Sequence, residues 1–245
     1  MRALIVVPTY NELENIQNLA QSVMAVIPPN VDLLIVDDNS PDGTGKLADQ
    51  LAAQDSRIHV LHRARKMGLG TAYVNGFNWG LERGYEALIE MDADFSHDPK
   101  YLPRMLELLE INDVVIGSRY VPGGGTVNWG MGRKVLSRGG SMYSRLILGA
   151  GIRDFTGGFN GWRRKVIESV DLPSLRSDGY SFQIELKYRA FLKGFKITEF
   201  PIVFEDRKVG KSKMHRRIVI EALLRVWEFR FKSPFRQALV QTQRH

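Results

Sequence analysis

The sequence predicts an α/β protein in which a mostly parallel sheet is covered by helices on both faces. Short apolar runs alternate with segments that have the spacing of amphipathic helices, and polar turns separate them. Strands that alternate with helices along a chain form parallel sheets of this kind. The 245 residues are 44% hydrophobic and 25% charged, which is enough for one large domain with a sizeable core.

Seven apolar segments are expected to form strands, namely residues 3–8, 31–36, 58–62, 87–91, 113–117, 160–164 and 196–204. A helix is expected after Asn11, which can cap it because Glu14 follows at capping-box spacing. The other expected helices cover about 43–54, 70–83, 99–110, 133–148, 181–193 and 214–231. Polar or glycine-rich loops are expected at 37–43, 122–125, 154–159 and 205–213, and the tail after Pro234 is expected to fray.

The charge and the cysteine content limit the classes of function. Disulfides and cysteine-bound zinc are excluded because the chain has no cysteine. A net charge of +7 suits nucleic acid, an anionic membrane surface or anionic small substrates, and much of it falls after residue 118. No segment resembles a helix-turn-helix, a zinc finger or an aromatic RNA-binding motif, so a nucleic-acid partner is not expected.

The apolar runs are too short for membrane insertion. The first run stops at Pro8, which is too early for a signal peptide, and no run reaches the roughly 18 residues of a membrane span. We therefore expect a cytoplasmic protein.

Polar residues cluster where four expected strands end. They are Tyr10, Asp38, the acids Asp92 and Asp94, and Arg119. Ligands of parallel α/β sheets bind beyond the carboxyl ends of the strands, so these side chains should share one crevice.

Asp92 and Asp94 stand one residue apart at the end of an apolar run. Residues i and i+2 of a strand point to the same face, so both carboxylates should converge. Two such carboxylates suit a hard cation such as Mg²⁺ or Mn²⁺, which commonly also binds substrate phosphates. The alternative interpretation is two loop acids that face water.

Seven short motifs together resemble the family-2 glycosyltransferases of the GT-A fold, and within them the dolichyl- or polyprenyl-phosphate mannosyltransferases. They cover nearly the whole chain in the order that the family has. They are residues 7–12 (VPTYNE), 36–44 (VDDNSPDGT), 66–73 (KMGLGTAY), 91–94 (MDAD), 117–120 (GSRY), 156–159 (TGGF) and 179–183 (GYSFQ).

The resemblance implies a GT-A fold, which is a Rossmann-like, mostly parallel sheet with helices on both faces. It also implies an inverting transfer of mannose from GDP-mannose to a polyprenyl (dolichyl) phosphate, with a divalent metal. Residues 1–213 would be the catalytic domain, with a nucleotide-binding half at about 1–118 and an acceptor half at about 119–213. Residues 214–245 would add an amphipathic helix and a tail.

The resemblance also assigns roles to single residues. It implies metal binding by Asp94 and Asp92, with Ser96 in a position where some relatives carry a glutamine ligand, and catalysis by Asp94, Asp92 and Arg207. The positions that match nucleotide-sugar binding are Pro8, Tyr10, Glu12, Val36, Asp38, Asp92, Ala93, Asp94, Arg119, Arg207 and Lys213. The positions that match acceptor-phosphate binding are Arg119, Arg133, Ser137 and Arg207.

Two of these positions have ordinary structural interpretations as well. Asp38 could cap a turn, but Asp37 can do so while Asp38 faces the crevice. Val36 suits the core better than a ligand contact.

A phosphate monoester acceptor is already an anion at neutral pH, with a second pKa of about 6, so no catalytic base is needed. Asp154 and Asp178 are interpreted as turn or cap residues.

The helices at about 133–148 and 214–231 look amphipathic, with basic residues beside apolar ones that include Trp227 and Phe231. Such helices can lie on a bilayer or dock on the core, and the sequence leaves both open. We expect peripheral binding at the cytosolic face of a membrane, directly or through a separate membrane-anchoring subunit.

Two other functions stay open: a polyprenyl-phosphate glucosyltransferase or other nucleotide-sugar transferase, and a non-catalytic nucleotide-sugar-binding subunit.

Overall fold

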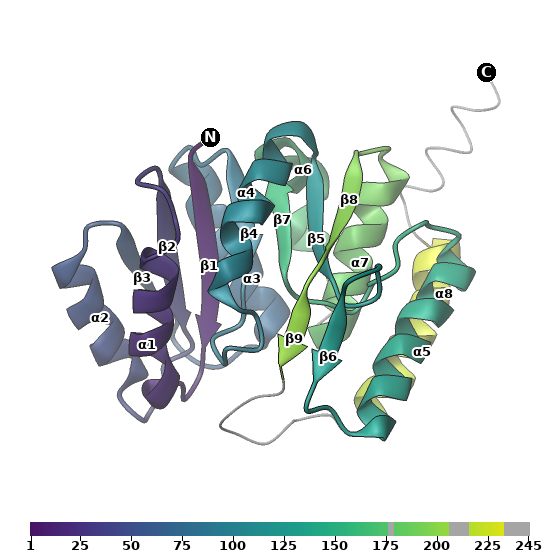
Figure 1. Cartoon of the computed structure of the whole chain (residues 1–245), viewed down its shortest axis with the longest axis horizontal. Helices are drawn as coiled ribbons and strands as arrows, with labels where there is room; N and C mark the ends of the chain where they lie inside the picture. Colours follow the sequence, from purple (N-terminus) through teal and green to yellow (C-terminus); the bar gives the residue numbers. More distant parts are fainter. Residues whose placement is uncertain (176–178, 206–215, 233–245) are drawn as a thin grey trace.

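A computed structural model of the chain describes residues 1–175, 179–205 and 216–232, which Figure 1 shows in colour. The strands of the large sheet are β1 (Ala3–Thr9), β2 (Val31–Asp37), β3 (Ile58–His62), β4 (Ala87–Glu90), β5 (Val114–Ser118), β7 (Asn160–Arg163) and β8 (Ile197–Pro201). A small second sheet pairs β6 (Gly125–Val127) with β9 (Val203–Glu205).

The helices are α1 (Leu13–Met24), α2 (Thr44–Gln54), α3 (Leu69–Glu82), α4 (Leu102–Ile111), α5 (Met131–Leu148), α6 (Arg164–Ser169), α7 (Gly179–Leu192) and α8 (Arg216–Lys232). Two short 3₁₀ turns, η1 (Pro99–Tyr101) and η2 (Leu172–Ser174), complete the described elements.

The large sheet has the order β3-β2-β1-β4-β7-β5-β8. Within the described residues β7 alone runs antiparallel to its neighbours, which are β4 and β5, and the remaining pairs of this sheet are parallel. The predicted α/β class with a mostly parallel sheet is therefore confirmed. No helix in the described ranges has the length and apolarity that crossing a membrane requires.

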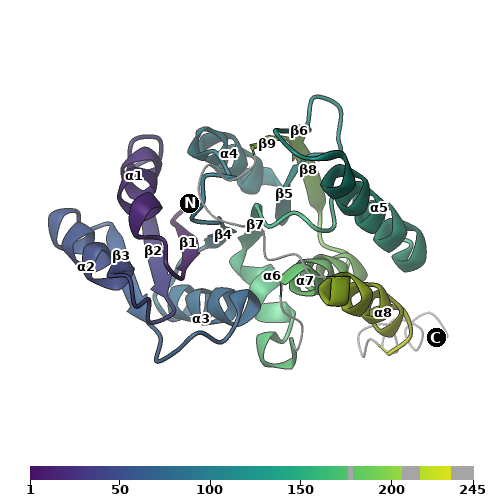
Figure 2. The same ribbon diagram turned by 90° about the horizontal axis from the view of Figure 1, so that it is seen from below.

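Each face of the large sheet carries its own apolar core. Leu4 and Val6 of β1 pack on one face, and Ala3, Ile5 and Val7 pack on the other, as the period of two along a strand requires. Helices α1, α2 and α4 cover one face, and α3, α6 and α7 cover the opposite face (Figure 2). The sheet is thus buried on both sides, which agrees with its nearly continuous apolar strands.

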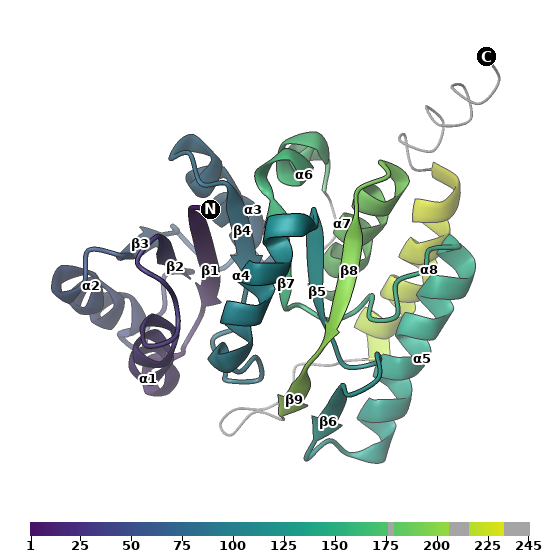
Figure 3. The same cartoon turned by 45° about the horizontal axis from the view of Figure 1, so that its top comes forward.

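Helices α5 and α8 lie side by side at one end of the molecule (Figures 1 and 3). The hydroxyl of Tyr143 on α5 donates to the carbonyl of Leu223 on α8 at 3.2 Å. Arg230 on α8 donates back to the carbonyl of Leu148 at 3.2 Å. Because Val226 and Phe229 are buried in the core that α3 and α7 share, this pair is attached to the main domain.

Two local predictions are wrong. The expected strand at 196–204 is split at Ile202, whose N–H donates to Ser118 of the large sheet and whose carbonyl accepts from Gly125 of the small sheet. The chain therefore passes from one sheet to the other at this residue. Asn11 does not cap α1 either: it has a φ of 60°, and Glu12 occupies the cap position without a hydrogen bond from its side chain to the first turn of the helix.

The start of α1 is held by the loop before α2 instead. The N–H of Glu12 donates to Thr44 Oγ1 at 2.9 Å, and the N–H of Leu13 donates to Asp42 Oδ2 at 3.2 Å. The two helices that flank the ends of β1 and β2 are therefore tied together at the edge where the polar residues lie.

Arg207 and Lys213, to which the resemblance assigns roles, lie outside the described residues, as do Asp178, the expected domain boundary after residue 213 and the tail. The division into catalytic domain and C-terminal helix stays a prediction.

Gly76 on α3 is required for the close approach of this helix to the sheet. A Cβ at Gly76 would lie 2.4 Å from Cγ1 of Val6, whereas a Cβ at Gly139 on α5 would meet nothing within 4 Å. Gly76→Ala should lower the free energy of unfolding by about 1–2 kcal/mol, because overpacking exceeds the gain in helix propensity. Gly139→Ala should raise it by up to about 1 kcal/mol. Urea unfolding followed by circular dichroism compares the two, and equal effects would contradict the packing argument.

Candidate active site

The carboxyl ends of β1, β2, β4 and β5 meet at one edge of the large sheet. These four strands all point the same way, because β7 runs antiparallel to both β4 and β5. Tyr10, Asp38 and Arg119 follow directly after the ends of β1, β2 and β5, and Asp92 is the second residue after β4. The crevice predicted from the sequence therefore has the expected residues along a single edge.

Asp92 and Asp94 lie in the loop after β4 and are held by different partners. Asp92 accepts from the hydroxyl of Tyr73 on α3 at 3.1 Å. Asp94 is nearly buried, and Ser96 donates both its N–H and its hydroxyl to Asp94 Oδ1, at 3.1 and 2.5 Å. Phe95 between them has a φ of 60°, so the loop turns sharply enough to bring Ser96 back to Asp94.

His97 is a site residue that the sequence reasoning missed. Its Nδ1 accepts the backbone N–H of Asp92 at 3.0 Å, so the neutral ring carries its proton on Nε2. Burial lowers the pKa of His97, although the nearby Asp92 carboxylate acts in the opposite direction. The ring stacks near Phe159 and meets the edge of Phe204, at centroid distances of 5.2 and 5.4 Å. The buried ring of His97 thus holds the backbone N–H of Asp92.

The oxygen ligands that the protein offers here fit a Mg²⁺ or Mn²⁺ ion whose remaining ligands come from a substrate and water. Asp92 and Asp94 supply hard oxygen atoms, and in the described part of the chain no three His, Asp or Glu side chains form a complete metal site. A Cβ added to Gly158 would lie 3.9 Å from Asp92 Oδ2, so the backbone of this glycine lies close beside the carboxylate. One or two carboxylates completed by substrate phosphates and water are the usual environment of Mg²⁺.

Asp38 forms a buried ion pair with Arg63, the residue that follows β3. Arg63 Nη1 lies 2.8 Å from Asp38 Oδ1, and both residues are 6% exposed. Arg63 Nη2 also donates to Thr71 Oγ1 at 2.7 Å, and the N–H of Met67 donates to Asp38 at 3.4 Å. Burial raises the pKa of Asp38, while the Arg63 guanidinium opposes this rise.

The sequence reasoning missed Arg63, although its position after a predicted strand and beside the 66–73 motif was a usable signal. Asp37 was expected to cap the turn after β2, and this is confirmed. Its carboxylate accepts from the Ser40 N–H at 3.0 Å and from the Thr9 hydroxyl at 3.1 Å.

The other positions implied for nucleotide binding lie in β1 and β2 and in the segments that follow β1 and β4. Lys66 Nζ lies 3.8 Å from the ring centroid of Tyr10. Glu12 accepts from Asn15 Nδ2 at 2.8 Å. Val36 is fully buried in the core, as its apolar side chain suggested, Pro8 pairs with it across β1 and β2, and Ala93 is buried after β4.

Arg119 is held by Asp154, a residue interpreted from the sequence only as a turn residue. Asp154 does accept from the Gly157 N–H within its turn, but it also accepts from Arg119 Nε at 2.7 Å, from Nη2 at 2.6 Å and from the backbone N–H at 3.0 Å. Burial alone would raise the pKa of Asp154, yet the Arg119 guanidinium keeps it below its usual value. The interpretation of Asp154 as a plain turn residue was therefore incomplete.

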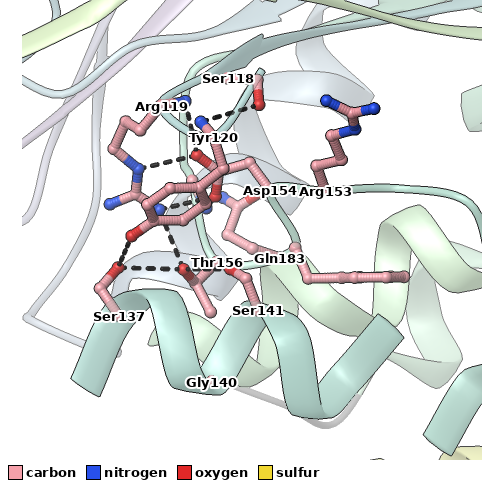
Figure 4. Close-up of polar contacts among 12 residues, drawn as sticks. Ser118, Arg119, Tyr120, Ser137, Gly140, Ser141, Arg153, Asp154, Thr156 and Gln183 are labelled. Carbon is pink, nitrogen blue, oxygen red and sulfur yellow. Dashed lines mark hydrogen bonds and ion pairs between the residues drawn. The ribbon is translucent and has the colours of Figure 1, made fainter. Parts of the chain in front are cut away.

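A chain of hydroxyl groups extends from Arg119 to α5 (Figure 4). Arg119 Nη2 donates to Thr156 Oγ1 at 2.9 Å, and Tyr120 donates to Ser137 Oγ at 2.7 Å. Thr156 Oγ1 lies 3.1 Å from Ser141 Oγ and 3.5 Å from Ser137 Oγ.

Arg133 joins the same group through an aromatic ring. Its guanidinium carbon lies 4.1 Å from the ring centroid of Trp129, and that of Arg119 lies 5.5 Å from it. The structure thus brings together Arg119, Arg133 and Ser137, three of the four residues implied for acceptor-phosphate binding. The fourth, Arg207, lies outside the described residues.

Removing the guanidinium of Arg63 should destabilise the protein, because Asp38 would stay buried without its counter-ion. Arg63→Met is expected to lower the free energy of unfolding by about 3 kcal/mol, the usual effect of breaking a buried pair. The matched control is Arg65→Met, whose side chain is exposed two residues later and should change stability by less than about 0.5 kcal/mol. Denaturant unfolding measures both, and similar losses would show that the pair is not responsible.

Comparisons with known proteins agree with this geometry. The sequence pattern of the family described as Glycosyl transferase family 2 matches residues 4–171. The chain is 49% identical, over 92% of its length and 93% of the relative, to an undecaprenyl-phosphate mannosyltransferase from Micrococcus luteus. It is 50% identical, over 93% of its length and 86% of the relative, to a polyprenol monophosphomannose synthase from Mycolicibacterium smegmatis.

Solved structures share the fold at low sequence identity. Glucosyl-3-phosphoglycerate synthase from Mycobacterium tuberculosis, in complex with Mn²⁺, UDP and glucosyl-3-phosphoglycerate, has a TM-score of 0.67 and 17% identity, covering 95% of this chain and 80% of that one. A mannosyltransferase from Pyrobaculum calidifontis, in complex with GDP-mannose and Mn²⁺, has a TM-score of 0.64 and 18% identity, covering 95% of this chain and 64% of that one. These findings confirm the resemblance first drawn from the motifs: the chain belongs to glycosyltransferase family 2 and has the GT-A-like fold of its members.

Proposed function

We propose that this protein is an inverting mannosyltransferase that moves mannose from GDP-mannose to a polyprenyl phosphate. The observation that carries the proposal is the 49–50% identity, over more than nine-tenths of the chain, to two proteins named as polyprenyl-phosphate mannose transferases. The arrangement of the site supports it, since acidic side chains suited to a metal lie at the same sheet edge as a group of arginines and hydroxyls.

Asp92 and Asp94 are the residues that would hold a divalent metal, either Mg²⁺ or Mn²⁺. When bound, the metal would neutralise charge that develops on the departing nucleoside diphosphate. Ser96 was placed among the metal ligands by sequence position, and both of its hydrogen bonds to Asp94 Oδ1 support a role in orienting that carboxylate. Asp92, fixed by Tyr73 and His97, would face the donor sugar and ribose.

The nucleotide would lie over the ends of β1 and β2. A carboxylate at Asp38 suits the N–H groups of guanine, and the Arg63 guanidinium 2.8 Å away favours its ionised form and holds it in place. Tyr10 offers a ring face to the base, Glu12 offers an acceptor to a ribose hydroxyl, and the backbone around Pro8, Val36 and Ala93 forms the floor. Arg207 and Lys213 are proposed to bind the diphosphate, as the family motif implies.

The acceptor phosphate would bind beside Arg119, Arg133 and Ser137, together with Arg207. It needs positioning and partial neutralisation of its charge rather than removal of a proton, because a phosphate monoester is an anion at neutral pH. Asp154, the carboxylate beside Arg119, is fully buried in its ion pair and so is poorly suited to act as a base. We propose in-line attack of a phosphate oxygen on the sugar C1 with inversion.

The nucleotide-sugar and acceptor preference can be tested directly. The purified protein is incubated with Mg²⁺ or Mn²⁺, a short polyprenyl phosphate and, in turn, GDP-mannose, UDP-glucose and other nucleotide sugars. Release of GDP from GDP-mannose, dependent on the lipid phosphate, is the expected result. UDP release from UDP-glucose would instead indicate a glucosyltransferase, and nucleotide binding without turnover would indicate a non-catalytic binding subunit.

Asp94→Asn should reduce mannosyl transfer by at least about a thousandfold without unfolding the protein, because a neutral amide cannot replace an ionised metal ligand. Chelation with EDTA should have a similar effect on the unaltered protein and should be reversed by excess Mn²⁺. The matched control is Asp98→Asn, since Asp98 lies four residues later and pairs with the surface residue Lys100. Near-normal activity of Asp94→Asn in the presence of EDTA would rule out the assigned role.

Exposed apolar side chains on α5 and α8 support binding at a membrane surface. On α5, Met131, Val135, Met142 and Leu146 are 74, 67, 61 and 72% exposed, and on α8, Leu224, Trp227 and Phe231 are 68, 45 and 65% exposed. Their spacing puts each set along one side of its helix, and the basic residues Arg138 and Arg145 are exposed beside the first. Such helices can lie in the headgroup layer of a bilayer.

We therefore propose that the protein is peripheral at the cytosolic face of the membrane that contains its lipid acceptor. The double variant Met142→Glu with Leu146→Glu should bind anionic phospholipid vesicles at least about tenfold more weakly in co-sedimentation, because two apolar contacts are lost. Ile111→Glu is the control, since Ile111 is 68% exposed on α4 but stands apart from α5 and α8. If unaltered protein fails to sediment with vesicles, a separate membrane-anchoring subunit becomes the better explanation.

A further inference from the structure

The ammonium group of Lys187 is fully buried beneath the turn that precedes β7. Its Nζ donates to the carbonyls of Asp154 at 2.9 Å, Phe155 at 3.3 Å and Gly157 at 2.7 Å. An ammonium group has three donors, so three carbonyls of one turn account for all of them. Burying a charge is costly unless it is paired and hydrogen-bonded, so a lysine at this position calls for an explanation.

Burial disfavours the charged form of Lys187, and the pKa of its ammonium group shows this effect. Desolvation lowers the pKa of Lys187 to about 8, while the Asp154 and Glu90 carboxylates act to raise it. A leucine at this position would avoid the penalty but would remove the ammonium donor that the carbonyls of Asp154, Phe155 and Gly157 share.

The turn that Lys187 holds carries three groups of the site. Asp154 fixes the guanidinium and the backbone of Arg119. Thr156 accepts from Arg119 and contacts Ser141 on α5. Gly158 follows directly and lies beside the Asp92 carboxylate. A shift of the turn would therefore move the arginine and the hydroxyls that face the acceptor.

A second residue on the same side of α7 contacts the same region. Gln183 lies one helical turn before Lys187, and its Oε1 accepts from Asn160 Nδ2 at 2.8 Å. Asn160 Nδ2 lies 3.2 Å from the Gly157 carbonyl and 2.7 Å from Glu90 at the end of β4. This side of α7 thus supports the turn at two points, from beneath the active site.

We propose that Lys187 is a positioning residue for the acceptor-binding part of the site. Its ammonium group fixes the carbonyls of Asp154, Phe155 and Gly157. The turn that these residues form then places Asp154 and Thr156 beside Arg119. Lys187 contacts neither substrate. The proposal rests on the function proposed above, because the affected ligand is the anionic lipid phosphate.

The same helix offers a matched control in Arg189. It is also buried, and it donates to the carbonyls of Val170 at 2.8 Å and Asp171 at 3.2 Å and to Ser174 Oγ at 2.6 Å. Like Lys187 it is a buried cation that holds a backbone segment, but this segment is 170–174, which carries none of the proposed substrate-binding residues.

The experiment compares Lys187→Met with Arg189→Met in the full chain. We expect Lys187→Met to raise the KM for a short polyprenyl phosphate at least about tenfold, while the Kd of GDP, measured by calorimetry, changes less than about twofold. Arg189→Met should lower the Tm at least as much and leave both constants near their normal values. Lys187→Gln, which keeps two N–H donors, should have an acceptor KM between those of the unaltered protein and Lys187→Met.

Several outcomes would overturn the proposal. An unchanged acceptor KM in Lys187→Met, or in Lys187→Gln if the methionine variant does not fold, would exclude a positioning role. Parallel changes of acceptor KM and GDP Kd in both the Lys187 and the Arg189 variants would show a general structural role. If the unaltered protein binds GDP but uses no polyprenyl phosphate, the proposed function itself fails, and that result is distinguishable because it appears before any substitution is made.

Discussion

The antiparallel insertion of β7 between β4 and β5 is the constraint on which the site depends. Because β7 opposes both neighbours, β4 and β5 remain parallel, and the residues that follow them, Asp92 and Arg119, emerge at the same edge. The reversed direction also places the start of β7, and with it the turn at 154–158, at that edge. A parallel strand in this position would present its end there instead, and Arg119 would lose its partner.

Buried charges recur around the site, and each one has a specific partner. Asp38 is paired with Arg63, and Asp154 with Arg119, while Lys187 is bound by carbonyls. Such pairs contribute little net stability compared with apolar side chains of similar size, because desolvation offsets the attraction. Their effect is to fix orientation: a guanidinium held on two sides presents its remaining edge in one direction. Within the described residues, the charged side chains at this sheet edge are therefore held by contacts inside the protein itself.

Much of the fold followed from the sequence, because apolar periodicity and turn residues are local signals. The strand ends also located Asp38, Asp92 and Arg119 at one edge. The failures are of a different kind. The break at Ile202 depends on hydrogen bonds to Ser118 and Gly125, and the start of α1 depends on Asp42 and Thr44, all distant in the sequence. The partners of Asp38, Arg119 and Lys187 are likewise set by tertiary contacts, which no spacing rule reveals.

The core on the α3 and α7 face runs without interruption from Leu4 of β1 to Phe229 of α8. Residues before and after position 118 consequently share one set of packed side chains on this face rather than meeting across an interface. Helix α8, which is far in the sequence from Asp92 and Asp94, thus packs into the same core as the sheet whose strand β4 leads to these two residues.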